Sequence, residues 1–192
     1  QTNYGYDDAF ISKFNPDGTN EWSRLISSGA YDYANALTIG NEGSIFVAGQ
    51  IGKGNGSISN AFLAEFDSFG NRNNDTWWHS NTPSTYDYAT ALTTGIDGSI
   101  YLAGDTTRDA ESITSSGIYD AFVVKFDPNL IQQNSQEWTK YLGSSSIDDY
   151  GKALTTGNDG SIYIAGYTMG DLDNQTHNCL LYTSDAADDA NC

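Results

Sequence analysis

The strongest constraint on the fold of this chain is a short segment that occurs three times. It reads GNEGSIFVAGQ at residues 40–50, GIDGSIYLAGDT at residues 95–106 and GNDGSIYIAGYT at residues 157–168. The glycine of its Ala-Gly pair recurs as Gly49, Gly104 and Gly166, which gives a period of about 50 to 60 residues. A repeat of this length is typical of architectures that stack one supersecondary unit, each copy of which needs neighbours to bury its apolar face.

Each repeat predicts four short strands. The first alternates apolar and other residues, which is the pattern of a half-buried strand: Ala9–Phe14 (AFISKF), residues 61–66 (AFLAEF) and residues 121–126 (AFVVKF). A strand with tryptophan follows, around Trp22, Trp77/Trp78 and Trp138. The third has mostly small side chains: residues 34–39, 89–94 and 151–156. The fourth is apolar on both faces, as expected for a strand buried on both sides: residues 44–48, 99–103 and 161–165.

The acidic residues before glycines predict turns. Asp97 and Asp159 precede a glycine between the third and fourth strands, and Asp17 precedes Gly18 in an Asn-Pro-Asp-Gly turn. Asp-Gly between two apolar segments is a strong hairpin signal. These loops lack the oxygen-ligand ladder and final glutamate of a calcium-binding EF-hand loop, so we interpret them as hairpin turns.

Four antiparallel strands per repeat and no helical periodicity predict an all-β fold, a β-propeller fragment of about three blades. If each blade begins at the small-residue strand, residues 34–80 and 89–142 form two complete blades, with half a blade at each end. Propellers generally need four to eight blades. We therefore expect the missing blades to come from the same parent chain or from self-association, since open blades expose sheet edges.

The chain divides into two parts. Residues 1–178 form the repeat segment, with blades incomplete at both ends, and residues 179–192 are predicted to be a non-native tail. Within this tail, residues 179–188 resemble a translated sequencing adapter, a contaminant of metagenomic gene sets. Both cysteines, Cys179 and Cys192, lie in the tail, so no disulfide or thiolate metal site is expected in the repeats.

The repeats resemble the SBBP family of bacterial β-propeller repeats. The resemblance rests on four segments: DAFISKFNPDG at residues 8–18, DAFVVKFDP at residues 120–128, DDYGKAL at residues 148–154 and GNDGSIYIAGYT at residues 157–168. It covers nearly all of residues 7–168. It implies a propeller of exported or cell-surface bacterial proteins, often beside adhesion or calcium-binding modules, and no catalytic residue set to carry over.

Net charge and hydropathy exclude some classes of binding partner. The formal net charge of −17 repels nucleic acid and anionic lipid. No apolar segment is long enough to insert into a membrane, and residues 1–10 contain no signal peptide. We expect no nucleic acid partner and no membrane insertion, a secreted or cell-surface location, and a protein or glycan as partner.

The candidate binding residues are Asp32, Asp87 and Asp149, each followed by a tyrosine and placed before the small-residue strand. Carboxylates gathered at one face of a propeller could bind Ca²⁺, which takes six to eight oxygen ligands. The alternative is that each aspartate accepts hydrogen bonds from loop amides while the tyrosine packs between blades, and we favour this structural role. No catalytic or metal-ligating residue is predicted, because His79 and His177 fit no metal or triad pattern.

Two functions remain open. The first is a non-catalytic propeller segment of a larger exported bacterial protein, which acts as a scaffold or as a binding or adhesion surface without a cofactor. The alternative is part of a calcium-dependent, propeller-type exoenzyme of the hydrolase class, suggested by the acidity and the repeated Asp-Tyr pairs. We prefer the first, since no catalytic motif occurs in the chain.

Overall fold

The structure is a computed structural model that describes residues 7–53, 58–77, 86–107, 119–127, 136–143 and 148–172. Within these ranges the chain forms strands and turns, and none of their elements is a helix that could span a membrane. Trp78, His79, His177 and the tail predicted at residues 179–192 lie outside the described residues. The division of the chain at residue 178 therefore stays a prediction.

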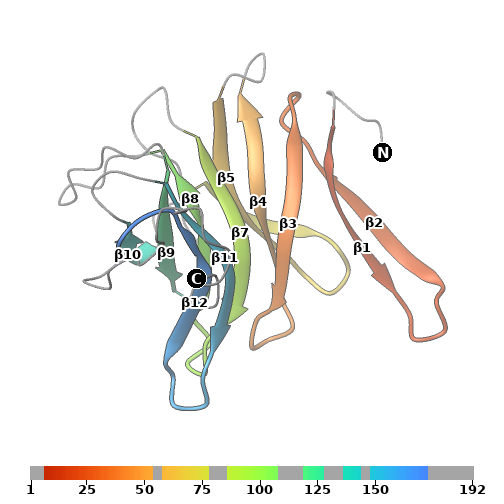
Figure 1. Ribbon diagram of the computed structural model, residues 1–192. Coiled ribbons are helices and arrows are strands. Elements are labelled where there is room, and N and C mark those ends of the chain that lie inside the picture. Colours follow the sequence, from red (N-terminus) through yellow and green to blue (C-terminus); the bar gives the residue numbers. More distant parts are fainter. Residues whose placement is uncertain are drawn as a thin grey trace, which may run out of the picture.

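Twelve strands make up the described chain (Figure 1). In chain order they are β1 (Ala9–Phe14), β2 (Asn20–Ile26), β3 (Asp32–Ile39), β4 (Ile45–Lys53), β5 (Ile58–Phe66), β6 (Arg72–Trp77), β7 (Asp87–Thr94), β8 (Ile100–Thr106), β9 (Asp120–Phe126), β10 (Gln136–Leu142), β11 (Asp149–Thr156) and β12 (Ile162–Thr168). They form two four-stranded antiparallel sheets, β3-β4-β5-β6 and β7-β8-β9-β10, and two two-stranded sheets, β1-β2 and β11-β12. All sheet neighbours are consecutive in the chain.

This topology confirms the predicted fold and its phasing. Two complete blades begin at the small-residue strands, and half a blade flanks them on each side. The extent of several strands differs from the prediction. The small-residue strands begin two residues earlier, at the Asp-Tyr pairs, and β4 continues to Lys53, because antiparallel pairing with β5 carries the ladder on from Ile45↔Phe66 to Lys53↔Ile58.

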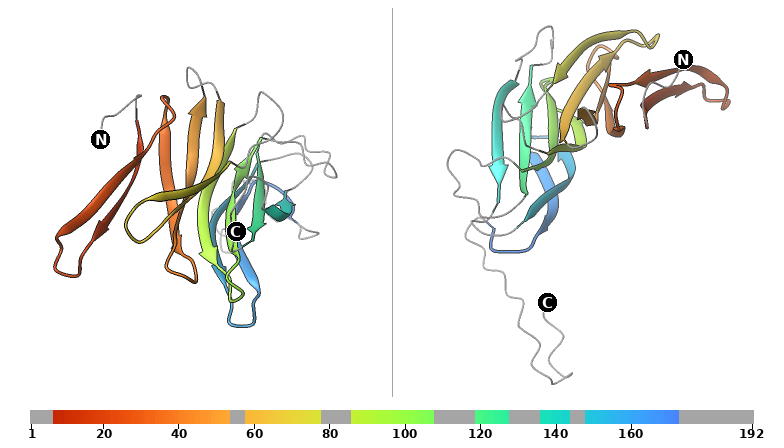
Figure 2. Two further views of the ribbon diagram at one scale, coloured as in Figure 1. Left: turned by 180° about the vertical axis from the view of Figure 1, so that it is seen from behind. Right: turned by 90° about the horizontal axis from the view of Figure 1, so that it is seen from above.

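The small-residue strands β3, β7 and β11 lie next to one another where the blades meet (Figure 1). The side-chain amide of Asn35 on β3 donates a hydrogen bond to the Ala89 carbonyl at 2.9 Å. The Thr90 hydroxyl on β7 donates one to the Gly151 carbonyl at 2.6 Å. Small side chains let these strands approach closely. From above, the blades follow one another in an arc from β1–β2 to β11–β12 (Figure 2).

Apolar side chains pack between the blades in two clusters. One cluster joins the first two blades of the arc: Ala9, Ile11, Trp22 and Ile26 against Val47, Ile51, Phe62, Ala64 and Phe66. The other joins the two complete blades: Phe46, Ala48, Ala61 and Leu63 against Ala89, Ile100, Leu102, Phe122, Val124 and Phe126. Alternate residues of β4 therefore serve both clusters, which confirms the prediction of a strand apolar on both faces. Burying each phenylalanine contributes about 1.5–3 kcal/mol.

A bulge explains the repeated Ala-Gly pair. In β7 the register shifts between Ala89 and Ala91, opposite Gly104. A β-carbon on Gly104 would overlap the carbonyl oxygen of Tyr88, and the same holds for Gly49 with Tyr33 and Gly166 with Tyr150. The bulge brings backbone against backbone, so only glycine fits.

Candidate functional site

The site is built at the end of the blades where the inner strands begin. Each of β3, β7 and β11 starts with an Asp-Tyr pair. Because successive side chains of a strand point to opposite faces, the aspartate and the tyrosine separate. The aspartates Asp32, Asp87 and Asp149 are all buried, whereas the tyrosines reach the surface to different extents.

Hydrogen bonds connect the starts of the inner strands to neighbouring segments. Asp32 accepts hydrogen bonds from the amide nitrogen of Ser28 at 2.6 Å and from that of Gly52 at 3.1 Å. Asp87 accepts one from the Thr106 hydroxyl. The third aspartate, Asp149, is fixed through its backbone: its main-chain N–H donates a hydrogen bond to the Tyr119 carbonyl in the preceding blade at 2.8 Å. Asp32 thus makes the contacts that its predicted structural role requires.

The structure does not gather these three aspartates into a metal site. Within the described ranges, no three histidine, cysteine, aspartate or glutamate side chains come together in a group that could hold a metal ion. The hairpin interpretation of the Asp-Gly loops is confirmed. Asp17, Asp97 and Asp159 each accept a hydrogen bond from the amide two residues later, at 2.9–3.0 Å, and Gly98 and Gly160 have φ of 83° and 85°.

Tyrosines form a continuous row across the blades at this end. The distances between ring centroids are 6.4 Å for Tyr86–Tyr88, 6.2 Å for Tyr88–Tyr119, 5.4 Å for Tyr119–Tyr150 and 4.7 Å for Tyr150–Tyr167. We call these five residues the tyrosine row. It connects β7 with β12 and offers ring faces and hydroxyl groups side by side.

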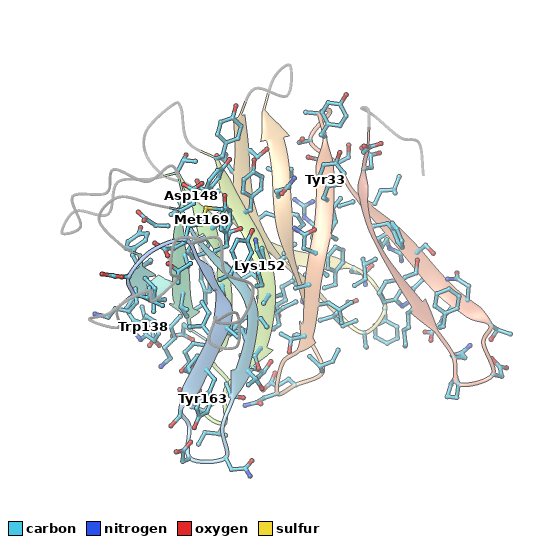
Figure 3. The ribbon with its side chains drawn as sticks, in the orientation of Figure 1. Tyr33, Trp138, Asp148, Lys152, Tyr163 and Met169 are labelled. Atoms are coloured by element: carbon cyan, nitrogen blue, oxygen red, sulfur yellow. The ribbon has the colours of Figure 1, made fainter. Side chains whose placement is uncertain are left out.

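Lys152 covers one end of the tyrosine row. Its ammonium lies 4.8 Å from the ring centroid of Tyr150 and 5.7 Å from that of Tyr167, within the range of cation–π attraction. The same ammonium lies 2.7 Å from Asp105 on the neighbouring blade. Figure 3 shows Tyr33 and Asp148 towards this end of the molecule, and Tyr163 at the opposite end.

The environment of the row disfavours the tyrosinate form. Burial raises the pKa of Tyr88 to about 12, and neighbouring Tyr119 adds to this effect. Burial raises the pKa of Tyr150 to about 12 as well, with a further contribution from Asp148, which accepts a hydrogen bond from the Tyr150 hydroxyl at 3.2 Å. The rings therefore stay neutral at physiological pH and act as apolar faces with hydroxyl donors.

Sequence reasoning found two members of the row and missed three. Tyr88 and Tyr150 belong to the repeated Asp-Tyr pairs. Tyr86 recurs only as Tyr31, and Tyr119 and Tyr167 have no tyrosine at the same position of another repeat. Their signal in the sequence was weak: each lies within two residues of a strand end on the side where the inner strands begin. Only the arrangement of the blades brings them into line.

Comparison with known proteins identifies the repeat. Residues 137–173, which include β11, β12 and all but the first residue of β10, match the family model of the SBBP β-propeller repeat. The chain carries an SBBP repeat. This match confirms the resemblance inferred from the sequence.

The chain was also compared with curated proteins and with solved structures. No curated protein matches the chain. A solved structure of a protein of unknown function from Bacteroides caccae is similar at 13% sequence identity and a TM-score of 0.42, over 79% of this chain. This chain spans 44% of the length of that protein.

Proposed function

We propose that this SBBP segment is a non-catalytic part of a larger exported bacterial protein, and that the tyrosine row is its binding surface for an extracellular glycan or protein. The observation that carries the proposal is the unbroken row of five rings over two neighbouring blades. Tyrosine supplies a rigid apolar face and a polar tip, which suits a surface that binds amphipathic ligands.

The composition, which is poor in lysine and rich in tyrosine, asparagine and threonine, supports an exported location together with the family resemblance. Sequencing the source DNA across both ends of this gene tests that part of the proposal. We expect further SBBP repeats and an export signal in the same reading frame. A frame with neither would argue against a larger exported parent.

A binding panel tests the surface itself. We would measure binding of the intact chain to arrayed glycans and extracellular proteins, and repeat the measurement with Tyr88→Ala and Tyr150→Ala. We expect each substitution to weaken binding about tenfold or more, as for central aromatic residues of interfaces. Phe69→Ala is the matched control, because Phe69 is an exposed aromatic residue in the turn between β5 and β6, at the opposite end of the blade. Equal binding by all variants would contradict the proposal.

A further inference from the structure

The tyrosine row contains a pair of rings that connects two blades. Tyr119 directly precedes β9 of the second complete blade, and Tyr150 is the second residue of β11, the inner strand of the next blade. Their ring centroids lie 5.4 Å apart, with an angle of 30° between the ring planes. In the complete blades the third and outer strands follow on the far side of the second strand. Strands added to β12 in the same order would therefore leave the contact between Tyr119 and Tyr150 in place.

Asp148 fixes both tyrosines of this pair. Its Oδ1 accepts a hydrogen bond from the main-chain N–H of Tyr119 at 3.0 Å, and its Oδ2 accepts one from the Tyr150 hydroxyl at 3.2 Å. The Tyr119 carbonyl in turn accepts the hydrogen bond from the main-chain N–H of Asp149 at 2.8 Å. Hydrogen bonds that cross from one blade to the next therefore hold the two rings beside each other.

The carboxylate at the Tyr150 hydroxyl favours one-electron oxidation of this phenol. A tyrosine that loses an electron also loses its phenolic proton, which passes to the group that accepts the hydrogen bond. Burial raises the pKa of Tyr150 to about 12, so the ring is neutral at physiological pH and its oxidation requires a proton acceptor. Asp148 is half-buried and can release the proton to solvent.

The other neighbour of Tyr150 is less suited to a covalent bond with it. Tyr150 and Tyr167 lie directly opposite each other in the β11–β12 ladder, and their rings stack with 4.7 Å between centroids. A bond between the carbons beside the hydroxyls requires the ring edges to meet, which a face-to-face stack opposes. The Lys152 ammonium lies 5.7 Å from the Tyr167 ring, and its positive charge opposes the loss of an electron. At Tyr150 the Asp148 carboxylate offsets that charge.

We propose that Tyr119 and Tyr150 are a site of oxidative cross-linking, at which a haem peroxidase and hydrogen peroxide join the two rings as dityrosine. Each tyrosine loses one electron and its phenolic proton, and the Tyr150 proton passes to Asp148. The two radicals form one carbon–carbon bond between ring carbons ortho to the hydroxyls. The hydrogen atoms of those carbons move to the oxygens and restore both hydroxyl groups. The two electrons and two protons reduce one hydrogen peroxide to two molecules of water.

The cross-link would join a complete blade to the inner strand of the next blade. Residues 1–178 contain no cysteine, so a dityrosine would serve there as the covalent staple that a disulfide provides elsewhere. A covalent bond that closes a loop restricts the unfolded chain and raises stability. No ligand takes part in the reaction, so a failure of cross-linking is distinct from a failure of the binding proposed for the same row.

Peroxidase treatment of the full chain at low concentration tests the site. We expect dityrosine fluorescence in a species that migrates as a single chain. Mass spectrometry should find peptides with Tyr119 and Tyr150 joined and lighter by two hydrogen atoms. The melting temperature of the cross-linked chain should rise by several degrees. Dityrosine between chains only, a bond from Tyr150 to Tyr167 instead, or no dityrosine in the folded chain would overturn the proposal.

Variants that keep the rings test the assignment. Tyr119→Phe and Tyr150→Phe remove one hydroxyl each and should abolish the cross-link, with circular dichroism confirming that the strands remain. Tyr163→Phe is the matched control, because Tyr163 is an exposed tyrosine at the opposite end of the molecule, and it should leave the yield unchanged (Figure 3). Asp148→Asn keeps an oxygen for the Tyr119 amide but takes up no proton, so cross-linking at pH 7 should slow severalfold. A yield indifferent to Tyr150→Phe would overturn the site, and a rate indifferent to Asp148→Asn would overturn the role of the carboxylate.

Discussion

Lys152 on β11 and Asp105 on β8 form an ion pair between two neighbouring blades, with 2.7 Å between Nζ and Oδ2. The amide of Gly151 donates a second hydrogen bond to Asp105, at 2.8 Å to Oδ1. Asp105 is buried, and burial raises the pKa of its carboxyl group although Lys152 and the Gly151 amide oppose that shift. The pair therefore joins the half-blade β11–β12 to the complete blade before it.

Replacing the lysine should destabilise the chain in a pH-dependent way. We expect Lys152→Met to lower the free energy of unfolding by about 1–2 kcal/mol at pH 7, a moderate loss because the lysine is partly exposed. A carboxyl group with a raised pKa in the folded state favours folding when protonated and opposes it as the pH rises through that pKa. The loss should therefore shrink towards pH 4. Denaturant unfolding at several pH values measures this loss. Lys140→Met is the control, because Lys140 is an exposed residue of β10.

The glycine opposite the bulge should be irreplaceable. Gly104→Ala places a methyl group on the Tyr88 carbonyl oxygen and against the Phe122 ring, so we expect a loss of at least about 3 kcal/mol or a failure to fold. Gly18→Ala is the comparison, because Gly18 has open space around it and a φ of 86°, so that only backbone strain of about 1–2 kcal/mol is added. Thermal unfolding of both variants measures the difference. Equal losses would show that the close approach at the bulge relaxes at little cost.

The tyrosine row should respond to alkali. The pKa values of Tyr88 and Tyr150 are raised to about 12 in the folded state, above the ordinary value of 10. The folded state therefore favours the neutral tyrosines, and this contribution to stability is fully present below pH 10. That contribution is lost as the pH rises from about 10 to about 12. Absorbance of tyrosinate and circular dichroism, recorded together, should show these tyrosines ionising as the strands unfold. Ionisation of all tyrosines near pH 10 with the fold intact would contradict this.

Calcium should not change the stability of the described fold. An ion that binds only the folded state raises the melting temperature of the protein. The aspartates Asp32, Asp87 and Asp149 are buried separately at the starts of three strands, so we expect equal melting temperatures in millimolar Ca²⁺ and in chelator. A rise of several degrees with Ca²⁺ would instead favour the alternative of a calcium-dependent exoenzyme segment.

The sequence by itself determined the strand content, the repeat phasing and the hairpin turns of this protein. These are local properties: alternation in AFVVKF predicts β9, and Asp97-Gly98 predicts the turn between β7 and β8. The outcome matches because the interactions that form them lie within a few residues. The boundaries were less accurate at the Asp-Tyr pairs, where pairing with the next strand extends the ladder.

Only the tertiary structure decided what the repeated residues do. In the sequence, the aspartates Asp32, Asp87 and Asp149 are the candidate binding residues and the tyrosines after them are expected to pack between blades. Strand alternation instead buries the aspartates and turns the tyrosines towards the surface. The row from Tyr86 to Tyr167 mixes repeated and unrepeated positions, so no periodic pattern reveals it. The ion pair of Asp105 with Lys152 likewise spans two blades. Such contacts depend on how neighbouring sheets stack. The spacing of residues along the chain does not show which side chains of two stacked sheets come within reach of each other.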